Sequence, residues 1–91
     1  MEIRWSRLAA SDLDRIFDYI SKSNRIAAGD VIQTLYDGCA SLAEFPNRGR
    51  ISRMAGRREL VFPSLPYIAV YRVRAQAVEI IRIYHAAQDW P

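Results

Sequence analysis

The side chains best suited to chemistry on a phosphate group lie in the last third of the chain. One apolar run contains Arg72, and the next ends in Arg82, Tyr84 and His85. Cleavage of RNA through its own 2′-hydroxyl needs cationic groups for the developing phosphorane charge, a base for the hydroxyl and an acid for the departing oxygen. The arginines could supply the positive charge, and His85 or Glu59 could act as the acid or the base. Tyr84 could donate a proton or stack on a base. If the chain cleaves RNA, its candidate catalytic residues are Arg72, Arg82, Tyr84, His85 and Glu59.

Structural roles are also open to these residues. A lone histidine at the end of a strand is more often a surface or hydrogen-bonded residue than a catalytic one. Arg72 could pair with Glu59 or Glu79 across neighbouring strands. Alternation along a strand places Arg82 and Tyr84 on the face opposite the terminal histidine, so the three share a site only if the strand bends or bulges.

Positive charge is concentrated between residues 46 and 74. Residues 1–45 carry five basic and seven acidic side chains, whereas residues 46–74 carry seven arginines against Glu59 alone. Arginine forms bidentate contacts with phosphate and carboxylate groups, although a GC-rich genome would also favour arginine codons. The clustering predicts a surface for an acidic partner or nucleic acid. Its candidate residues are Arg48, Arg50, Arg53, Arg57, Arg58 and Arg74.

The composition predicts one cytoplasmic domain over residues 1–91. Half of the residues are apolar and a quarter are charged, which is typical of a folded chain. No apolar run approaches the roughly 20 residues that span a bilayer, and the N-terminus lacks the apolar core of a signal peptide. The single cysteine, Cys39, excludes an internal disulfide, and the usual zinc-ligand spacings are absent. We expect no metal and no cofactor.

Periodicity predicts two helices after a short first strand at residues 3–5. Ser6 or Ser11 can cap the first helix, and acidic residues at 12 and 14 would then lie in its first turn. This helix is expected to end near residues 23–24. A second apolar pattern runs from Ala28 to Phe45 and is stopped by Pro46. Two helices joined by a few residues form an antiparallel hairpin.

The rest of the chain predicts a loop and three strands. Residues 46–56 lack a period and carry turn formers, and strand-like segments follow at 58–62, 68–73 and 78–84. The order is β-α-α-β-β-β, an α+β fold in which a helical hairpin packs on a small antiparallel sheet. In such a sheet Arg58, Arg72 and Arg82 would lie in three neighbouring strands and could meet on one phosphate.

Several motifs occur in a characteristic order. Trp5 is followed by an Ala-x-x-Asp-Leu-x-x-Ile-x-x-Tyr-Ile pattern at 9–20, Pro-x-x-Gly-Arg at 46–50, Arg58-Glu59, and Pro-Tyr-x-x-x-Tyr-Arg-Val at 66–73. A final strand then ends in histidine. In order and spacing the chain resembles, essentially end to end, the RelE/ParE superfamily. Its members are toxin subunits of bacterial type II toxin–antitoxin pairs, and their family fold agrees with the one predicted above.

The resemblance implies one of two activities on the same fold. RelE-type relatives cut messenger RNA in the ribosomal A site, and some have a functional histidine at the position of His85. ParE-type relatives poison DNA gyrase without nuclease chemistry. RelE-type enzymes with a Lys-rich loop would need lysines here, but Lys22 is the only one, and arginine is a poor proton donor or acceptor. The ending at residues 80–85 also looks ParE-like, so gyrase is favoured. The alternatives are a ribosome-dependent mRNA endonuclease and a decayed, non-toxic antitoxin-binding module.

A cognate antitoxin is the partner that the resemblance implies. A small sheet with a free edge and an apolar groove beside two helices can accept a strand or an amphipathic helix from another chain. An acidic antitoxin segment is expected over the Arg48–Arg74 surface. Operator DNA would be bound only through the antitoxin, and no membrane contact is expected.

Overall fold

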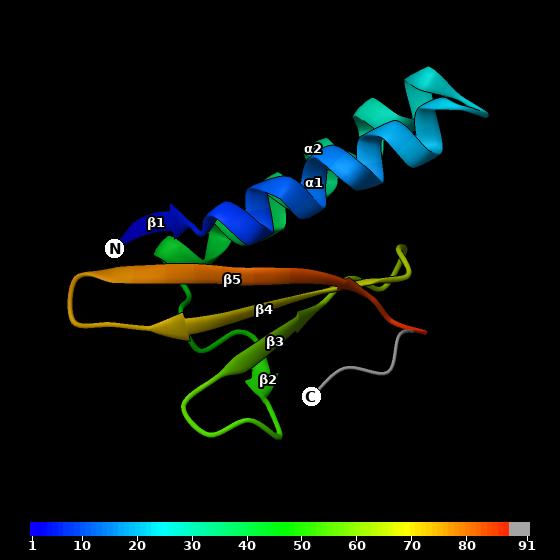
Figure 1. Cartoon of the computed structure of the whole chain (residues 1–91). Helices are drawn as coiled ribbons and strands as arrows, with labels where there is room; N and C mark the ends of the chain where they lie inside the picture. The colour runs from blue at the N-terminus through cyan, green and yellow to red at the C-terminus, as the bar shows by residue number, and fades with distance from the viewer. Residues whose placement is uncertain (88–91) are drawn as a thin grey trace.

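The structure, a computed structural model, describes residues 1–87. Figure 1 shows two helices lying side by side over one face of a sheet. The predicted α+β fold, with a helical hairpin packed on a small sheet, is confirmed. The elements are β1 (Glu2–Trp5), α1 (Arg7–Ser21), α2 (Arg25–Ala40), a 3-10 turn (Ser41–Ala43), β2 (Arg50–Ile51), β3 (Arg58–Val61), β4 (Tyr67–Val73) and β5 (Ala77–His85).

The sheet is mixed, which corrects the all-antiparallel expectation. Its strand order is β1-β5-β4-β3-β2, and β1 runs parallel to β5 while the other neighbours are antiparallel. Parallel neighbours need a long crossover, which the helical hairpin and the later strands provide between β1 and β5. The short strand β2 was missed, because only Arg50 and Ile51 pair with β3 inside a segment that otherwise has the composition of a loop.

Polar caps fix the start of both helices. The Ser6 hydroxyl accepts a hydrogen bond from the backbone N–H of Ala9 (3.0 Å) and donates to the carbonyl of Ile81 in β5 (2.7 Å). The Asn24 side chain accepts from the N–H of Ala27 (3.0 Å). Because α1 begins at Arg7, Asp12 lies in its second turn, and the expected acidic first turn is wrong. The helix also ends at residue 21, slightly earlier than predicted.

One hydrophobic core lies between the hairpin and the sheet. From the helical side it receives Leu35 and Cys39 of α2, and from the sheet Tyr71 and Ile80, all fully buried. Full burial of a large apolar side chain stabilises a fold by about 1.5–3 kcal/mol. Helix α1 contacts both α2 and β5 and presents different faces to the two. None of the helices within residues 1–87 is long and apolar enough to cross a membrane.

Candidate functional site

Three of the five candidate catalytic residues lie together at the end of β5, after a β-bulge in that strand. Val70 pairs with Arg82 but Tyr71 pairs with Ile80, so β5 carries one extra residue at this point. The bulge precedes all three residues and the pairing from Arg82 to His85 is regular, so it does not change the faces that Arg82, Tyr84 and His85 occupy relative to one another. All three line a groove of about 710 Å³ between α1 and the end of β5.

Arg82 is held by Asp12 of α1. Its Nε and Nη2 atoms donate to the two Asp12 oxygens at 2.8 and 3.0 Å, and the backbone N–H of Ile83 donates to Oδ2 at 2.9 Å. Arg15 also pairs with this carboxylate, which is 2% exposed. The hydrogen bonds that Arg82 donates to Asp12, followed by the negative charge of Asp12, raise the pKa of Arg82. The guanidinium group is therefore a permanent charge with an internal counter-ion.

Tyr84 and His85 are also engaged within the protein. The Arg82 guanidinium lies 5.0 Å from the centre of the Tyr84 ring, a cation–π contact. The His85 ring meets Tyr67 edge to face, with ring centres 5.5 Å apart, and its Nδ1 atom accepts from the N–H of Ala87 at 3.1 Å. A neutral His85 with this contact carries its proton on Nε2.

Arg72 and Glu59 lie outside the groove. Arg72 Nε donates to Glu79 Oε1 at 2.5 Å, and Arg74 Nε donates to the same oxygen at 3.1 Å. The hydrogen bond from Arg72, followed by that from Arg74, lowers the pKa of Glu79. Glu59 is buried and bonds to Arg50 at 2.8 Å. Sequence analysis offered Glu59 or Glu79 as the ion-pair partner of Arg72, and the structure pairs it with Glu79.

The six arginines assigned to partner binding differ in their surroundings. Arg50 and Arg74 pair with carboxylates, as described above, and Arg53 lies in the β2–β3 connection. Among residues 1–87, Arg48, Arg57 and Arg58 have no carboxylate partner. Arg48 instead donates to the Ser41 hydroxyl at 2.9 Å, and Arg58 to the carbonyl of Gly49 at 2.8 Å. These three arginines are the positive charges left for an acidic partner.

A tyrosine latch holds the arginine-bearing loop on the sheet. The Tyr71 hydroxyl donates to the carbonyl of Pro46 and accepts from the N–H of Gly49, both at 2.8 Å. Burial raises the pKa of Tyr71, so the hydroxyl keeps its proton for this bond. Gly49 is required because a Cβ atom there would lie 2.6 Å from the Tyr71 oxygen. The Pro-x-x-Gly motif was the sequence signal for this latch, although its partner could not be read from it.

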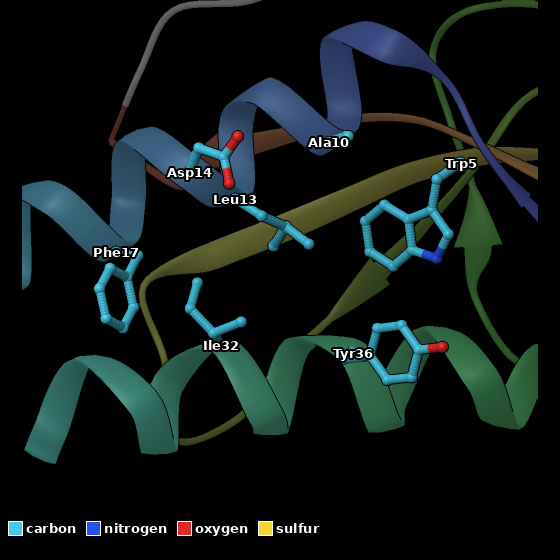
Figure 2. A pocket seen from close by; sticks show the side chains of 7 residues that line it. All are labelled: Trp5, Ala10, Leu13, Asp14, Phe17, Ile32 and Tyr36. Atoms are coloured by element: carbon cyan, nitrogen blue, oxygen red, sulfur yellow. The ribbon is translucent and has the colours of Figure 1, made fainter.

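An apolar groove opens along the helical hairpin, as expected beside two helices (Figure 2). Trp5 and Tyr36 form one end, stacked with ring centres 6.1 Å apart and planes 1° from parallel. Leu13, Phe17 and Ile32 continue the wall toward the α1–α2 turn. The groove measures about 340 Å³, and the other lining residues are Ala10 and Asp14. Its shape and apolar lining fit an amphipathic helix. Within residues 1–87, no three metal-ligating side chains are placed to hold an ion.

Comparisons with known proteins agree with this geometry. A family model described as ParE toxin of the type II toxin–antitoxin system matches residues 3–90. The chain is 42% identical to Y4kP of Sinorhizobium fredii, which is described as a toxin, over 98% of this chain and 92% of that protein. It is 38% identical to toxin RelE2 of Caulobacter vibrioides, over 96% and 97% of the two chains.

Two solved structures share the fold. A chain of the chromosomal ParDE toxin–antitoxin system of P. aeruginosa is 32% identical, with a TM-score of 0.85 over 93% of this chain and 95% of that one. A chain of the intact E. coli RelBE toxin–antitoxin complex superposes with a TM-score of 0.69 over 96% and 98% at 15% identity, which is a likeness of fold alone. Family model, sequence relatives and fold agree that this chain belongs to the ParE toxin family of type II toxin–antitoxin systems.

Proposed function

We propose that this toxin arrests growth in the cytoplasm by acting on DNA gyrase and that it has no nuclease chemistry. The observation that carries the proposal is the pairing of every charged catalytic candidate. Asp12 neutralises Arg82, Glu79 neutralises Arg72, and Arg50 neutralises Glu59. A guanidinium whose donors are bound to a carboxylate contributes little to a developing phosphorane charge, and a paired carboxylate is a weak base. The match to the ParE family model supports the same choice.

The second candidate is a ribosome-dependent mRNA endonuclease. It is favoured by the meeting of Arg82, Tyr84 and His85 in one groove and by the relative named RelE2. In that case the Nε2 atom of His85 would serve as the acid or base, and Arg82 would serve after leaving Asp12.

A supercoiling reaction with purified gyrase tests the first candidate. We expect the purified toxin to inhibit supercoiling and to accumulate linear DNA that remains bound to gyrase through a covalent link. Unchanged supercoiling with no trapped cleavage complex, using toxin that arrests growth in cells, would exclude gyrase as the target.

Primer extension on translated messenger RNA tests the second candidate. Cells lacking the antitoxin are sampled before and after induction of the toxin. We expect intact transcripts in arrested cells, and full growth arrest from a chain carrying both Arg82→Ala and His85→Ala, provided that this variant folds. Cuts within codons that vanish when translation is blocked would establish the nuclease instead. A chain that folds, binds its antitoxin and causes no arrest would be the decayed module.

We also propose a cognate antitoxin as the partner. The similar structures are of toxin–antitoxin systems, and the apolar hairpin groove offers a place for an amphipathic antitoxin helix. Arg48, Arg57 and Arg58 offer unneutralised charge for an acidic segment that follows the helix. Operator DNA would be contacted through the antitoxin. Trp5 lies in the groove, so antitoxin binding should change its fluorescence, and a chain carrying Trp5→Phe should lose that change.

A further inference from the structure

A second groove lies on the other side of α1 from the hairpin groove. It runs between α1 and the ends of β4 and β5 and is about twice as large, about 710 against 340 Å³. Arg15, Tyr19 and Ile20 of α1 line one side, and Tyr67 and Tyr84 line the other.

Helix α1 supplies different residues to the two grooves. Leu13 and Phe17, four positions apart, line the hairpin groove, whereas Ile16 and Ile20, also four apart, line the second groove. A substitution on one face of α1 therefore leaves the other groove intact. Tyr19 is 73% exposed at the rim of the second groove, so most of its ring surface is accessible to a partner.

The charge that the second groove presents outward is positive. Among residues 1–87, Asp12 is the one carboxylate that lines it, and this residue is 2% exposed and has its oxygens occupied by Arg82, Arg15 and the N–H of Ile83. The Arg15 side chain is 66% exposed, so most of its donors remain turned toward solvent. A ligand with a carboxylate complements this charge.

The lining favours a protein segment over nucleic acid. Ile16, Ile20, Pro66 and Ile83 provide aliphatic contacts, which suit an apolar side chain. Of the three tyrosines that line the groove, Tyr19 alone presents an open ring, because the Arg82 guanidinium lies against the Tyr84 ring and Tyr67 is 7% exposed. Successive bases would therefore find a single stacking surface here.

We propose that the groove between α1 and β5 binds an acidic segment of the toxin's target protein, with an apolar side chain of that segment seated between Tyr19 and Ile83. The inference rests on the proposed function in taking gyrase as that target. The hairpin groove then serves the antitoxin, and the two partners use opposite faces of one helix.

Two substitutions in the second groove test the proposal. Arg15→Glu reverses the outward charge of the groove, and Tyr19→Ala removes the exposed aromatic ring at its rim. The control is Asp30→Ala, at an exposed position of α2. Growth arrest, gyrase binding and antitoxin affinity are measured on the full chain, and urea unfolding checks each variant. We expect both groove variants to weaken gyrase binding and growth arrest at least about tenfold while antitoxin affinity changes less than about threefold. Asp30→Ala should match the wild type in all three.

The outcomes separate the groove from the choice of target. Full gyrase binding and full arrest by a folded Tyr19→Ala chain would overturn the groove as a target site. A tenfold loss of antitoxin affinity in Tyr19→Ala would also overturn it, because the groove would then belong to the antitoxin. Loss of arrest in both variants, when the wild type neither binds nor traps gyrase, would keep the groove as the target site and reject gyrase. Arg15 also pairs with Asp12, so the Arg15→Glu chain could fail to fold. In that case the result for Tyr19→Ala, a substitution at an exposed position, decides the test.

Discussion

At the scale of single residues, Asp12 is the residue that sequence reasoning most underrated. Sequence analysis placed it in the first turn of the helix as a charge near the N-terminus, yet it is 2% exposed and accepts hydrogen bonds from Arg82 and the backbone of Ile83. Its signal lay in the Asp-Leu pair of the family motif, which sequence alone could not connect to a strand 70 residues away. Asp12 ties α1 to β5 and shapes the groove between them.

We expect Asp12→Ala to lower the free energy of unfolding by about 2–3 kcal/mol. It leaves Arg82, whose side chain is 27% exposed, and the N–H of Ile83 without their acceptor, and partial exposure keeps the cost below that of a fully buried pair. Asp12→Asn retains an acceptor oxygen and should cost less, about 1–2 kcal/mol. Urea unfolding measures both, with Asp14→Asn as the control on the exposed side. Equal stability of Asp12→Ala and the Asp14 variant would mean that the pair contributes nothing.

Gly49 provides a second prediction. An added Cβ atom would lie 2.6 Å from the Tyr71 hydroxyl and 2.8 Å from the carbonyl of Glu59, so Gly49→Ala should break the latch and cost about 1–3 kcal/mol. Gly29, in α2, has nothing within 4 Å of the same position, so Gly29→Ala should stabilise by about 0.5–1 kcal/mol. Thermal unfolding of the two variants should therefore shift in opposite directions, and a shift in the same direction would contradict the geometry.

At the scale of elements, the helices and the three longer strands were predictable because each has a strong local signal. The Ser6 cap and the apolar period mark the helices, and alternating or apolar runs mark the strands. The second helix was predicted to continue to Phe45, but α2 ends at Ala40 and a 3-10 turn follows it. The direction of β1 and the two residues of β2 were not predictable. Both depend on which distant strand offers free backbone hydrogen bonds, and no local pattern encodes that choice.

The candidate site was predictable in part for the same reason. The sequence identified Arg82, Tyr84 and His85 as a group, and the structure brings them to one groove. It could not predict the bulge at Ile81, the partner of Arg82, or the separation of Arg72 and Glu59 from that groove. Each of these is a matter of register or tertiary contact.

The β4–β5 pair makes stability depend on pH through Glu79. Arg72 and Arg74 lower its pKa, so Glu79 stays ionised to lower pH in the folded protein than in the unfolded chain. Its contribution to stability is complete above the ordinary carboxyl pKa and is lost as pH falls through the lowered value. The wild type should therefore be more stable than Glu79→Gln at pH 7, and the two unfolding free energies should converge in acid. Glu44→Gln controls for removal of one negative charge. A constant difference at every pH would contradict the ion pairs.

At the scale of the whole molecule, two features could be used by one partner. The helical hairpin carries the apolar groove, and Arg48, Arg57 and Arg58, which have no carboxylate partner within residues 1–87, lie in or beside β2 and β3. A partner that contacts both the groove and these arginines must be long, with an amphipathic helix and an acidic extension.

The buried thiol of Cys39 offers an independent monitor of the folded state, because burial raises its pKa to about 12.

Affinity for the antitoxin should depend on salt through Arg48 and Arg57. These arginines have no carboxylate partner within residues 1–87, and charges on the rim of an interface act over about a Debye length. Arg48→Glu and Arg57→Glu should each weaken antitoxin binding about threefold to tenfold at low salt, mostly by slowing association. Titration at two salt concentrations and stopped-flow association with the labelled antitoxin measure both effects.

Arg25→Glu is the matched control, since it makes the same charge change at the start of α2, outside the Arg48–Arg74 surface. If all three variants lose the same affinity, net charge alone explains the effect and the antitoxin has no preferred path across the sheet edge. If only the two loop variants respond, and their loss vanishes at high salt, the acidic segment lies over the loop that Tyr71 and Gly49 hold in place. Gly49→Ala should then weaken the same interaction without changing any charge, because it releases the loop that presents Arg48.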